Sequence, residues 1–174
     1  NMFGDLTQEE MNLRMGLSVP QDKLRQPIIH VTSDSNDAIE WADKMWDHVK
    51  DQKACGSCWA FSAGAAFEAR YAIHNKREHA DALFSEQELV DCVTASHGCN
   101  GGWMDHAFEF LINSQFCTED IYPYHALDEA CKKTKCTSGP NDAGYHDISP
   151  GHEGDLLAEL KNGPVSVAVD ASNW

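Results

Sequence analysis

The chain has 174 residues, of which 42% are hydrophobic and 24% are charged, which is ordinary for a globular protein of one domain or slightly more. Its formal net charge is −15, from 28 acidic and 13 basic residues; it would repel a phosphate backbone, so we expect no nucleic-acid partner. No stretch approaches the roughly 20 apolar residues of a membrane-spanning helix, and we expect no membrane span.

The first 36 residues differ from the rest of the chain. Residues 1–15 are polar and compatible with a turn and one helix, whereas residues 16–36 contain Gly16, Pro20 and Pro27 and no sustained apolar period. This composition predicts an extended, exposed connector that is open to cleavage.

Regular elements are predicted from Trp41 onward. Residues 58–73 are rich in alanine and aromatic residues and apolar on most sides, which indicates a buried helix. Ser85 and Glu88 form a capping-box pattern at the start of a second helix. Five apolar residues at helical spacing predict a third, amphipathic helix: Met104, Ala107, Phe108, Leu111 and Ile112.

The chain ends with one more helix and a predicted strand. Residues 155–161 fit a short helix that the Asn-Gly-Pro tripeptide at 162–164 would end. Valines alternate with smaller or polar residues over 165–169, which is typical of a strand. The order of elements predicts an α+β protein whose sheet is only beginning at the last residues.

Cys58 lies where a Gly-Ser turn meets the first buried helix, and it is the candidate nucleophile. Unpaired backbone N–H groups and the positive end of the helix dipole favour the thiolate there, which is the attacking form. Gln52, six residues earlier, carries a side-chain amide donor. Together with the backbone N–H of Cys58, this amide would stabilise the oxyanion of an acyl-transfer intermediate.

A metal site is the alternative for the same cysteines. The Cys55-x-x-Cys58 pattern also occurs in redox and zinc sites, and Cys92 and Cys99 would bring the number of sulfurs to four. The interval between Cys92 and Cys99 is poor for a zinc ribbon, and no βαβ pattern supports a thioredoxin-like site. We expect no metal and no cofactor, with a zinc-binding module as the less favoured hypothesis.

The seven cysteines of the chain bear on its compartment. Such a number is typical of proteins in oxidising compartments, where disulfides persist, and an odd number leaves one thiol over. We expect a secreted protein or a resident of an acidic, lysosome-like vacuole, where protonation would relieve the negative charge.

Residues 55–59 match the C-G-[SA]-C-[WY] signature around the nucleophile of papain and the cathepsins. Further landmarks follow in the family's order, at residues 85–92, 98–104, 122–124 and 163–167. On these motifs the chain resembles the papain-like cysteine proteases, and it is most similar to their cathepsin L-like branch. The resemblance implies a papain-like fold and a cysteine endopeptidase that forms an acyl-enzyme on Cys58.

The resemblance also implies a division of the chain. Residues 1–36 would be a propeptide remnant and maturation linker, 37–147 the helical left domain around the Cys58 helix, and 148–174 the truncated start of the β-rich right domain. Asn1, Phe3 and Asp5 resemble the end of the family's inhibitory propeptide. The stretch from about 16 to 32 would then cover Cys58, running opposite to a substrate, with maturation cleavage between His30 and Asn36.

The resemblance pairs the cysteines as Cys55–Cys99 and Cys92–Cys131. Cys117 and Cys136 are additional to the simplest family pattern, and we expect them to form a third bridge. Cys58 is then the single free thiol.

By the same resemblance, Gly101 and Gly102 form the edge along which a peptide substrate binds, with Gly102 pairing to it as a short strand would. Trp103, Met104 and Ala168 would line the pocket for the second residue upstream of the scissile bond. These side chains are apolar, so we expect a preference for a bulky aliphatic or aromatic residue. Simple helix packing is the alternative for Trp103 and Met104.

None of the nine histidines matches the family's general base, which is expected about 130–150 residues after the nucleophile. His106 fits a surface or boundary position, and His97 fits a loop beside the glycine-rich edge. The chain alone is therefore expected to be inactive, as a zymogen or a fragment. Expected partners are peptide substrates, its own propeptide and, if the remaining C-terminal half is a separate chain, that half. The alternative function is a catalytically silent papain-fold subunit for binding or assembly.

Overall fold

The computed structural model describes residues 7, 9–10, 15–18, 38–46, 49–77 and 83–170. The helix expected in residues 1–15 and most of the connector lie outside these residues, apart from helical Glu9 and Glu10. The described elements are helical: α2 (Ala42–Met45), α3 (Cys58–His74), α4 (Glu86–Cys92), η1 (Gly98–Asn100), α5 (Met104–Ile112), η2 (Lys133–Lys135) and α6 (Glu153–Asn162).

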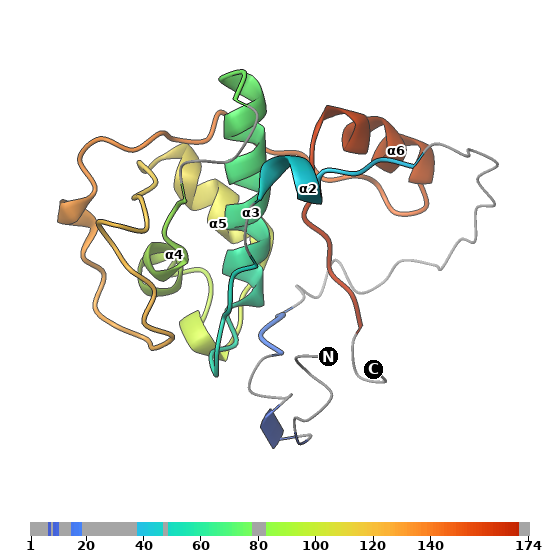
Figure 1. The fold of residues 1–174 in the computed structure, drawn as a ribbon. Coiled ribbons are helices and arrows are strands. Elements are labelled where there is room, and N and C mark those ends of the chain that lie inside the picture. The colour runs from blue at the N-terminus through green and yellow to red at the C-terminus, as the bar shows by residue number, and fades with distance from the viewer. Residues whose placement is uncertain are drawn as a thin grey trace.

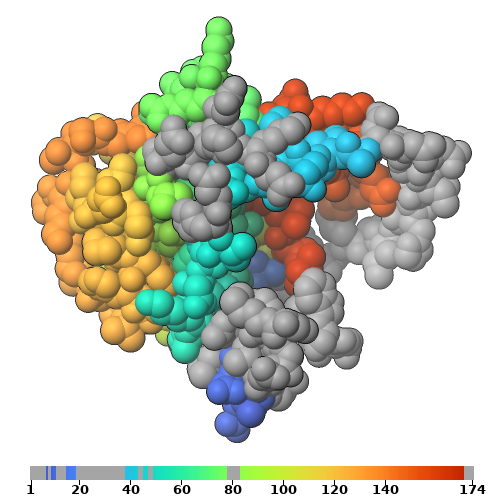
Figure 2. Space-filling view, in the orientation of Figure 1, coloured from blue at the N-terminus to red at the C-terminus, as the bar shows by residue number. Residues whose placement is uncertain are grey.

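Helix α3 runs through the centre of the molecule, with α5 and α4 packed against it (Figure 1). It has 17 residues, and buried side chains occur along most of its length, which confirms the predicted buried helix. In the space-filling view the segment around residues 120–140 lies on one side of α3, and α6 with α2 on the other (Figure 2).

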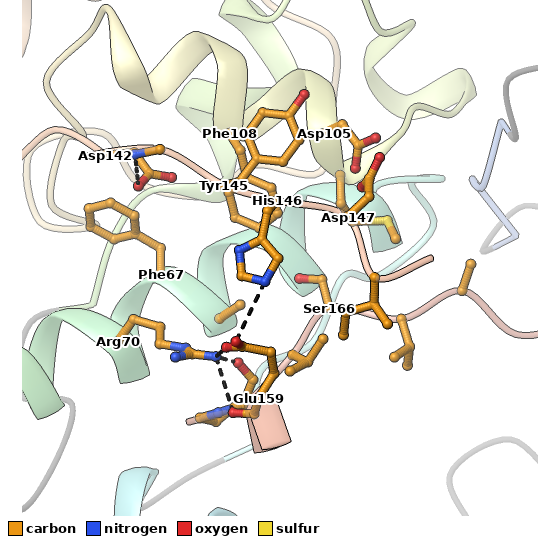
Figure 3. A pocket seen from close by; sticks show the side chains of 18 of the residues that line it. Phe67, Arg70, Asp105, Phe108, Asp142, Tyr145, His146, Asp147, Glu159 and Ser166 are labelled. Carbon is orange, nitrogen blue, oxygen red and sulfur yellow. Dashed lines mark hydrogen bonds and ion pairs between the residues drawn. The ribbon is translucent and has the colours of Figure 1, made fainter. Parts of the chain in front are cut away.

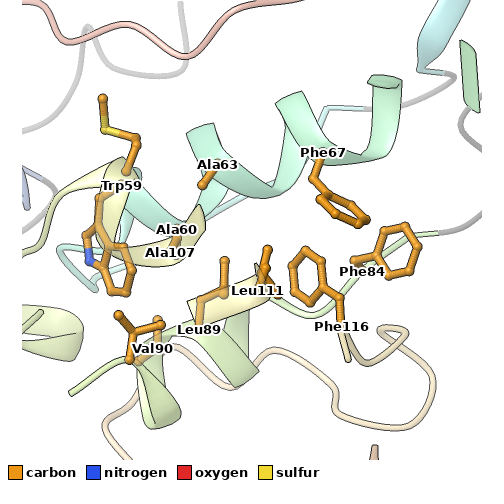
Figure 4. Close-up of a cluster of buried hydrophobic side chains, with 12 residues drawn as sticks. Trp59, Ala60, Ala63, Phe67, Phe84, Leu89, Val90, Ala107, Leu111 and Phe116 are labelled. Atoms are coloured by element: carbon orange, nitrogen blue, oxygen red, sulfur yellow. The ribbon is translucent and has the colours of Figure 1, made fainter. Parts of the chain in front are cut away.

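The core forms where α3, α4 and α5 meet the segment that follows α5 (Figure 4). Phe84 and Phe116 stack with their ring centroids 5.0 Å apart, and Phe67 of α3 meets both rings edge-on at 5.3 Å. Leu89 of α4 and Leu111 of α5 are fully buried beside them. The apolar face predicted for α5 is confirmed at its centre, whereas Ile112 lies at the exposed margin.

Helix α4 begins with only half of the predicted capping box. The Ser85 hydroxyl accepts a hydrogen bond from the backbone N–H of Glu88 at 2.9 Å, as expected of an N-cap. The Glu88 carboxylate accepts instead from the backbone N–H of Cys117, while the N–H of Ser85 donates to the Cys117 carbonyl. The box residues therefore fix the chain after α5 to the start of α4.

A buried ion network lies beside the same helices. The Lys50 ammonium donates to Glu68 of α3 and Glu86 of α4, both at 2.6 Å. Both carboxylates are almost completely buried. Burial raises the pKa of Glu86 to about 7 although Lys50 opposes the shift, and the two carboxylates in turn raise the pKa of Lys50. The network joins three segments that are distant in the sequence.

Helix α6 is confirmed, although it begins two residues before the expected start, and Gly163 follows it with a positive φ of 150°. The indole N–H of Trp41 donates to the Leu160 carbonyl at 2.7 Å, which ties the helix to α2.

The prediction of a strand over 165–169 is wrong, because residues 164–170 form no strand in the structure. Alternation marks a sheet face, but a strand also needs a partner, and the described residues pair in only two isolated bridges, Leu17 with Gly102 and Phe84 with Thr118. Val167 and Val169 are accordingly more than half exposed. Of the segment expected to begin the β-rich domain, residues 164–170, which follow α6, thus have no regular structure.

Candidate active site

Cys58 is the first residue of α3 and is half-buried. The preceding residue, Ser57, is the N-cap, and its backbone carbonyl accepts hydrogen bonds from Ala60 and Phe61 at 2.9 and 3.1 Å. The thiol therefore lies at the end of a long helix where backbone N–H groups lack helical acceptors, as the sequence predicted.

The other cysteines of the chain are all in disulfides. The structure contains the three expected pairs, Cys55–Cys99, Cys92–Cys131 and Cys117–Cys136. Cys58 is left as the free thiol. Three of the four sulfurs needed for the alternative zinc site are thus already bonded to other sulfurs, which removes the basis of that hypothesis.

The expected depression of the thiol pKa is not found in this form of the protein. Burial raises the pKa of Cys58, and hydrogen bonding from backbone groups of Gly16, Trp59 and Cys58 opposes the increase without outweighing it. The helix terminus thus acts in the predicted direction but is overcome by desolvation. The described residues place no histidine among the groups that shift this pKa.

Residues 15–18, which we call the strap, cover the site. The backbone N–H of Gly102 donates to the Gly16 carbonyl at 2.8 Å, and the N–H of Ser18 donates to the Gly102 carbonyl at 2.9 Å. Leu17 and Gly102 thereby form a parallel bridge. The strap occupies both backbone groups of Gly102, the residue that the family resemblance assigns to a bound peptide. A chain running the opposite way would pair antiparallel.

Glycines allow the strap to approach this closely. A Cβ at Gly16 would lie 1.6 Å from the carbonyl oxygen of Gly56, and one at Gly102 would lie 2.6 Å from the Trp59 ring. Gly101 has a φ of 116° and faces the Gly16 carbonyl. No larger residue fits at Gly16 without movement of the backbone.

We therefore expect Gly16→Val to displace the strap and expose Cys58. Two backbone hydrogen bonds of about 1 kcal/mol each would be lost, which corresponds to a roughly 30-fold larger open population. The rate of iodoacetamide alkylation of Cys58 in the uncleaved protein should rise accordingly. Ser18→Ala, which keeps both backbone hydrogen bonds, is the control; equal rates in the two variants would contradict the prediction.

Gln52 lies on the loop that leads to Cys58, the candidate nucleophile. Its side-chain N–H₂ donates to the Cys55 carbonyl at 2.9 Å, and the backbone N–H of Ser57 donates to the same oxygen at 2.8 Å. The amide is therefore held next to the turn that carries Cys58. Its role as an oxyanion donor stays a prediction.

The three residues expected to contact the substrate side chain do come together. Trp103, Met104 and Ala168 line one cavity of about 590 Å³ between α3, α5, α6 and residues 142–148. Figure 3 shows this cavity, in which Arg70 and His146 both interact with Glu159, at 3.3 and 3.5 Å. Cys58 is not among the lining residues, so the structure does not join this pocket to the candidate nucleophile.

Two residues that contact the loop between Gln52 and Cys58, or anchor it, were not predicted from the sequence. Tyr124, in the Tyr-Pro-Tyr landmark, hydrogen-bonds to both Ser57 and Gln52. Lys50, two residues before Gln52, anchors the same loop to the buried carboxylates. His106 hydrogen-bonds to Ser96 at 3.1 Å and is half-buried, as expected, and His97 is exposed in its loop.

Comparison with known proteins identifies the family of this arrangement. The sequence pattern that defines the papain family cysteine proteases matches residues 35–174. Human cathepsin L2 is 39% identical over 99% of the chain and 53% of its own length, and a Caenorhabditis elegans cathepsin L-like protein is 44% identical over 79% of the chain and 41% of its own length.

The solved structure of the digestive procathepsin L 3 of Tenebrio molitor larval midgut superimposes with a TM-score of 0.72 at 32% identity, over 92% of the chain and 52% of its own. The chain spans about half the length of the curated relatives it matches. No helix in the described part of the chain is long and apolar enough to cross a membrane.

Proposed function

The chain belongs to the papain family of cysteine proteases, and we propose that it is the nucleophile-bearing part of a cysteine endopeptidase in its zymogen form. The observation that supports this most directly is the position of Cys58, the free thiol at the start of α3, beside a glycine edge whose backbone pairs with the strap. A catalytically silent subunit would not need to keep this thiol free and cover it.

In the proposed reaction the sulfur of Cys58 attacks the carbonyl carbon of the scissile bond, the amine leaves, and a thioester acyl-enzyme forms. Water then hydrolyses the thioester and regenerates the thiol. The backbone N–H of Cys58 and the Gln52 amide would stabilise the oxyanion in both steps. We expect the general base to be a histidine about 130–150 residues after Cys58, beyond Trp174.

The strap would be part of the inhibitory propeptide, with residues 1–36 as remnant and linker, 37–147 as the left domain and 148–174 as the start of the right domain. It occupies Gly102 in a parallel sense, so cleavage and release of the strap would open this edge to a substrate that runs the other way. Trp103, Met104 and Ala168 favour a bulky apolar residue two positions upstream of the scissile bond.

An acidic vacuole or the exterior of the cell suits the molecule. Three disulfides persist in oxidising compartments, and the Glu86 carboxyl, with a pKa of about 7, is neutral in acid. The partners would be peptide substrates, the propeptide itself and the remaining half of the enzyme, on this chain or on a separate one.

The test is to label the full-length protein, after cleavage of the linker, with a peptidyl vinyl sulfone that carries leucine two positions before the reactive group. At pH 5 in mild reductant we expect one equivalent of label, located on Cys58 by mass spectrometry. The uncleaved protein is the control and should be labelled far more slowly. Cleaved protein that takes up no label would overturn the protease proposal in favour of the silent subunit.

A further inference from the structure

Tyr124 connects the two segments that carry the proposed catalytic groups. Its hydroxyl lies 2.6 Å from the Ser57 hydroxyl and 2.8 Å from the backbone oxygen of Gln52, although these residues are 67 and 72 positions away in the sequence. Ser57 directly precedes the nucleophile, and Gln52 carries the proposed oxyanion donor. The Tyr124 hydroxyl oxygen thus contacts both the residue before Cys58 and the backbone of Gln52.

The direction of these hydrogen bonds follows from the groups themselves. A backbone carbonyl only accepts, so the Tyr124 hydroxyl must donate to Gln52. The Ser57 hydroxyl then donates to the phenol oxygen, which gives a continuous chain from Ser57 through Tyr124 to Gln52. Hydrogen bonds in such chains polarise and strengthen one another. Burial raises the pKa of Tyr124 to about 12, so the phenol keeps its proton.

The position of the phenol is itself fixed. The backbone N–H of Tyr124 donates to the Glu119 carboxylate at 2.7 Å, and its ring packs edge-on against Phe61 of α3 with the centroids 4.9 Å apart. Ser57 is completely buried. Tyr124 is therefore held against the first turn of α3 by contacts that do not involve the Gln52 loop.

The Gln52 loop has a second attachment to the same turn. Its side-chain amide and the N–H of Ser57 both donate to the Cys55 carbonyl, at 2.9 and 2.8 Å. The backbone of Gln52 is thus fixed by Tyr124 and its side chain by Cys55. Loss of the phenol hydroxyl would release the backbone attachment alone.

We propose that Tyr124 is a positioning residue that holds the Gln52 loop against the start of α3, so that the Gln52 amide and the Cys58 N–H can converge on one oxyanion. This inference rests on the proposed protease function. It concerns the chemical step, because the hydroxyl touches no group that we assign to substrate binding.

The test compares Tyr124→Phe with Tyr122→Phe in the matured full-length protein. Tyr122 is a matched control: it is buried two residues away, and its hydroxyl donates to Asp91 at 2.7 Å and accepts from the Lys132 N–H at 3.1 Å, neither of which is on the Gln52 loop. Removal of an oxyanion donor lowers kcat about 10²–10³-fold, so loosening one should lower it roughly 10-fold. For Tyr124→Phe we expect this loss in kcat with KM within about 2-fold, and for Tyr122→Phe changes below about 2-fold in both.

A double-mutant cycle with Gln52→Ala separates positioning from general destabilisation. If Tyr124 acts through Gln52, Tyr124→Phe should lower kcat by less than about 2-fold once Gln52 is alanine. This proposal alone would be overturned if the losses in kcat from Tyr124→Phe and Gln52→Ala multiplied in the double variant. It would also be overturned if Tyr124→Phe and Tyr122→Phe had equal kcat values in an active enzyme. A wild-type protein that hydrolyses no peptide would overturn the protease function and this proposal with it. Urea unfolding of each variant verifies that it is folded under the assay conditions.

Discussion

Replacement of Cys58 by alanine is expected to lower kcat for peptide hydrolysis by at least about 10⁴-fold in the matured full-length protein, because it removes the proposed nucleophile of acyl transfer. The six other cysteines of the chain are in disulfides, so none of them can substitute. Alanine is favourable in a helix and Cys58 is only half-buried at the start of α3, so the fold should be retained. Hydrolysis of a fluorogenic peptide at pH 5 measures the loss.

The control for Cys58→Ala removes sulfur away from the site. Cys117→Ala combined with Cys136→Ala deletes one disulfide, which should cost about 2–4 kcal/mol of stability but leave kcat within a few-fold. Residual activity of Cys58→Ala above about one per cent of wild type would show that another group is the nucleophile.

The second large effect is expected on stability, from Lys50→Met. The substitution leaves Glu68 and Glu86 buried without their cation, and breaking such a group by removing one partner costs about 3–5 kcal/mol. Urea unfolding at pH 7.5 measures this cost. The exposed residue Lys135 provides the control, and Lys135→Met should change the free energy of unfolding by less than about 0.5 kcal/mol.

The loss of folding stability caused by Lys50→Met should depend on pH in a defined direction. Glu86 has a pKa of about 7 in the folded state and near 4.5 as a free side chain, so the folded state binds this proton more tightly. The stability that protonation contributes is fully present below about pH 4.5 and is lost as the pH rises through 7. A neutral Glu86 needs no cation, so the penalty of Lys50→Met should fall to roughly half at pH 4.5. A penalty that grows on acidification would refute this account of the network.

The sequence predicted the elements whose evidence is local. The apolar composition of α3, the serine before α4 and the helical spacing in α5 each depend on neighbours within one or two turns. The partner of Glu88 is 29 residues away, and Lys50 joins carboxylates 18 and 36 residues along the chain. No local pattern encodes such contacts, so the ion network and the altered capping box were missed.

The residues of the candidate site were predicted from the sequence, but the raised pKa of the Cys58 thiol was not. The free thiol of Cys58 and the three disulfides followed from the motif and the family resemblance, and the structure contains them. The role of Gly102 as a substrate edge stays a prediction, because the structure pairs it with the strap. The raised pKa of the thiol was not foreseen, because the helix argument omitted the desolvation that burial imposes. The role of Tyr124 was missed because its hydroxyl meets Gln52 only in the folded chain.

The bridge between Cys55 and Cys99 lies three residues from a thiol with the opposite redox requirement. As the proposed nucleophile, Cys58 would have to be reduced, whereas this disulfide must remain oxidised to join the Gln52 loop to the glycine edge. Exchange with an external thiol needs access to one sulfur of the bridge; Cys55 is 1% exposed, whereas Cys99 is only partly buried. A reductant used to keep Cys58 reduced would therefore reach the bridge from the Cys99 side rather than through Cys55.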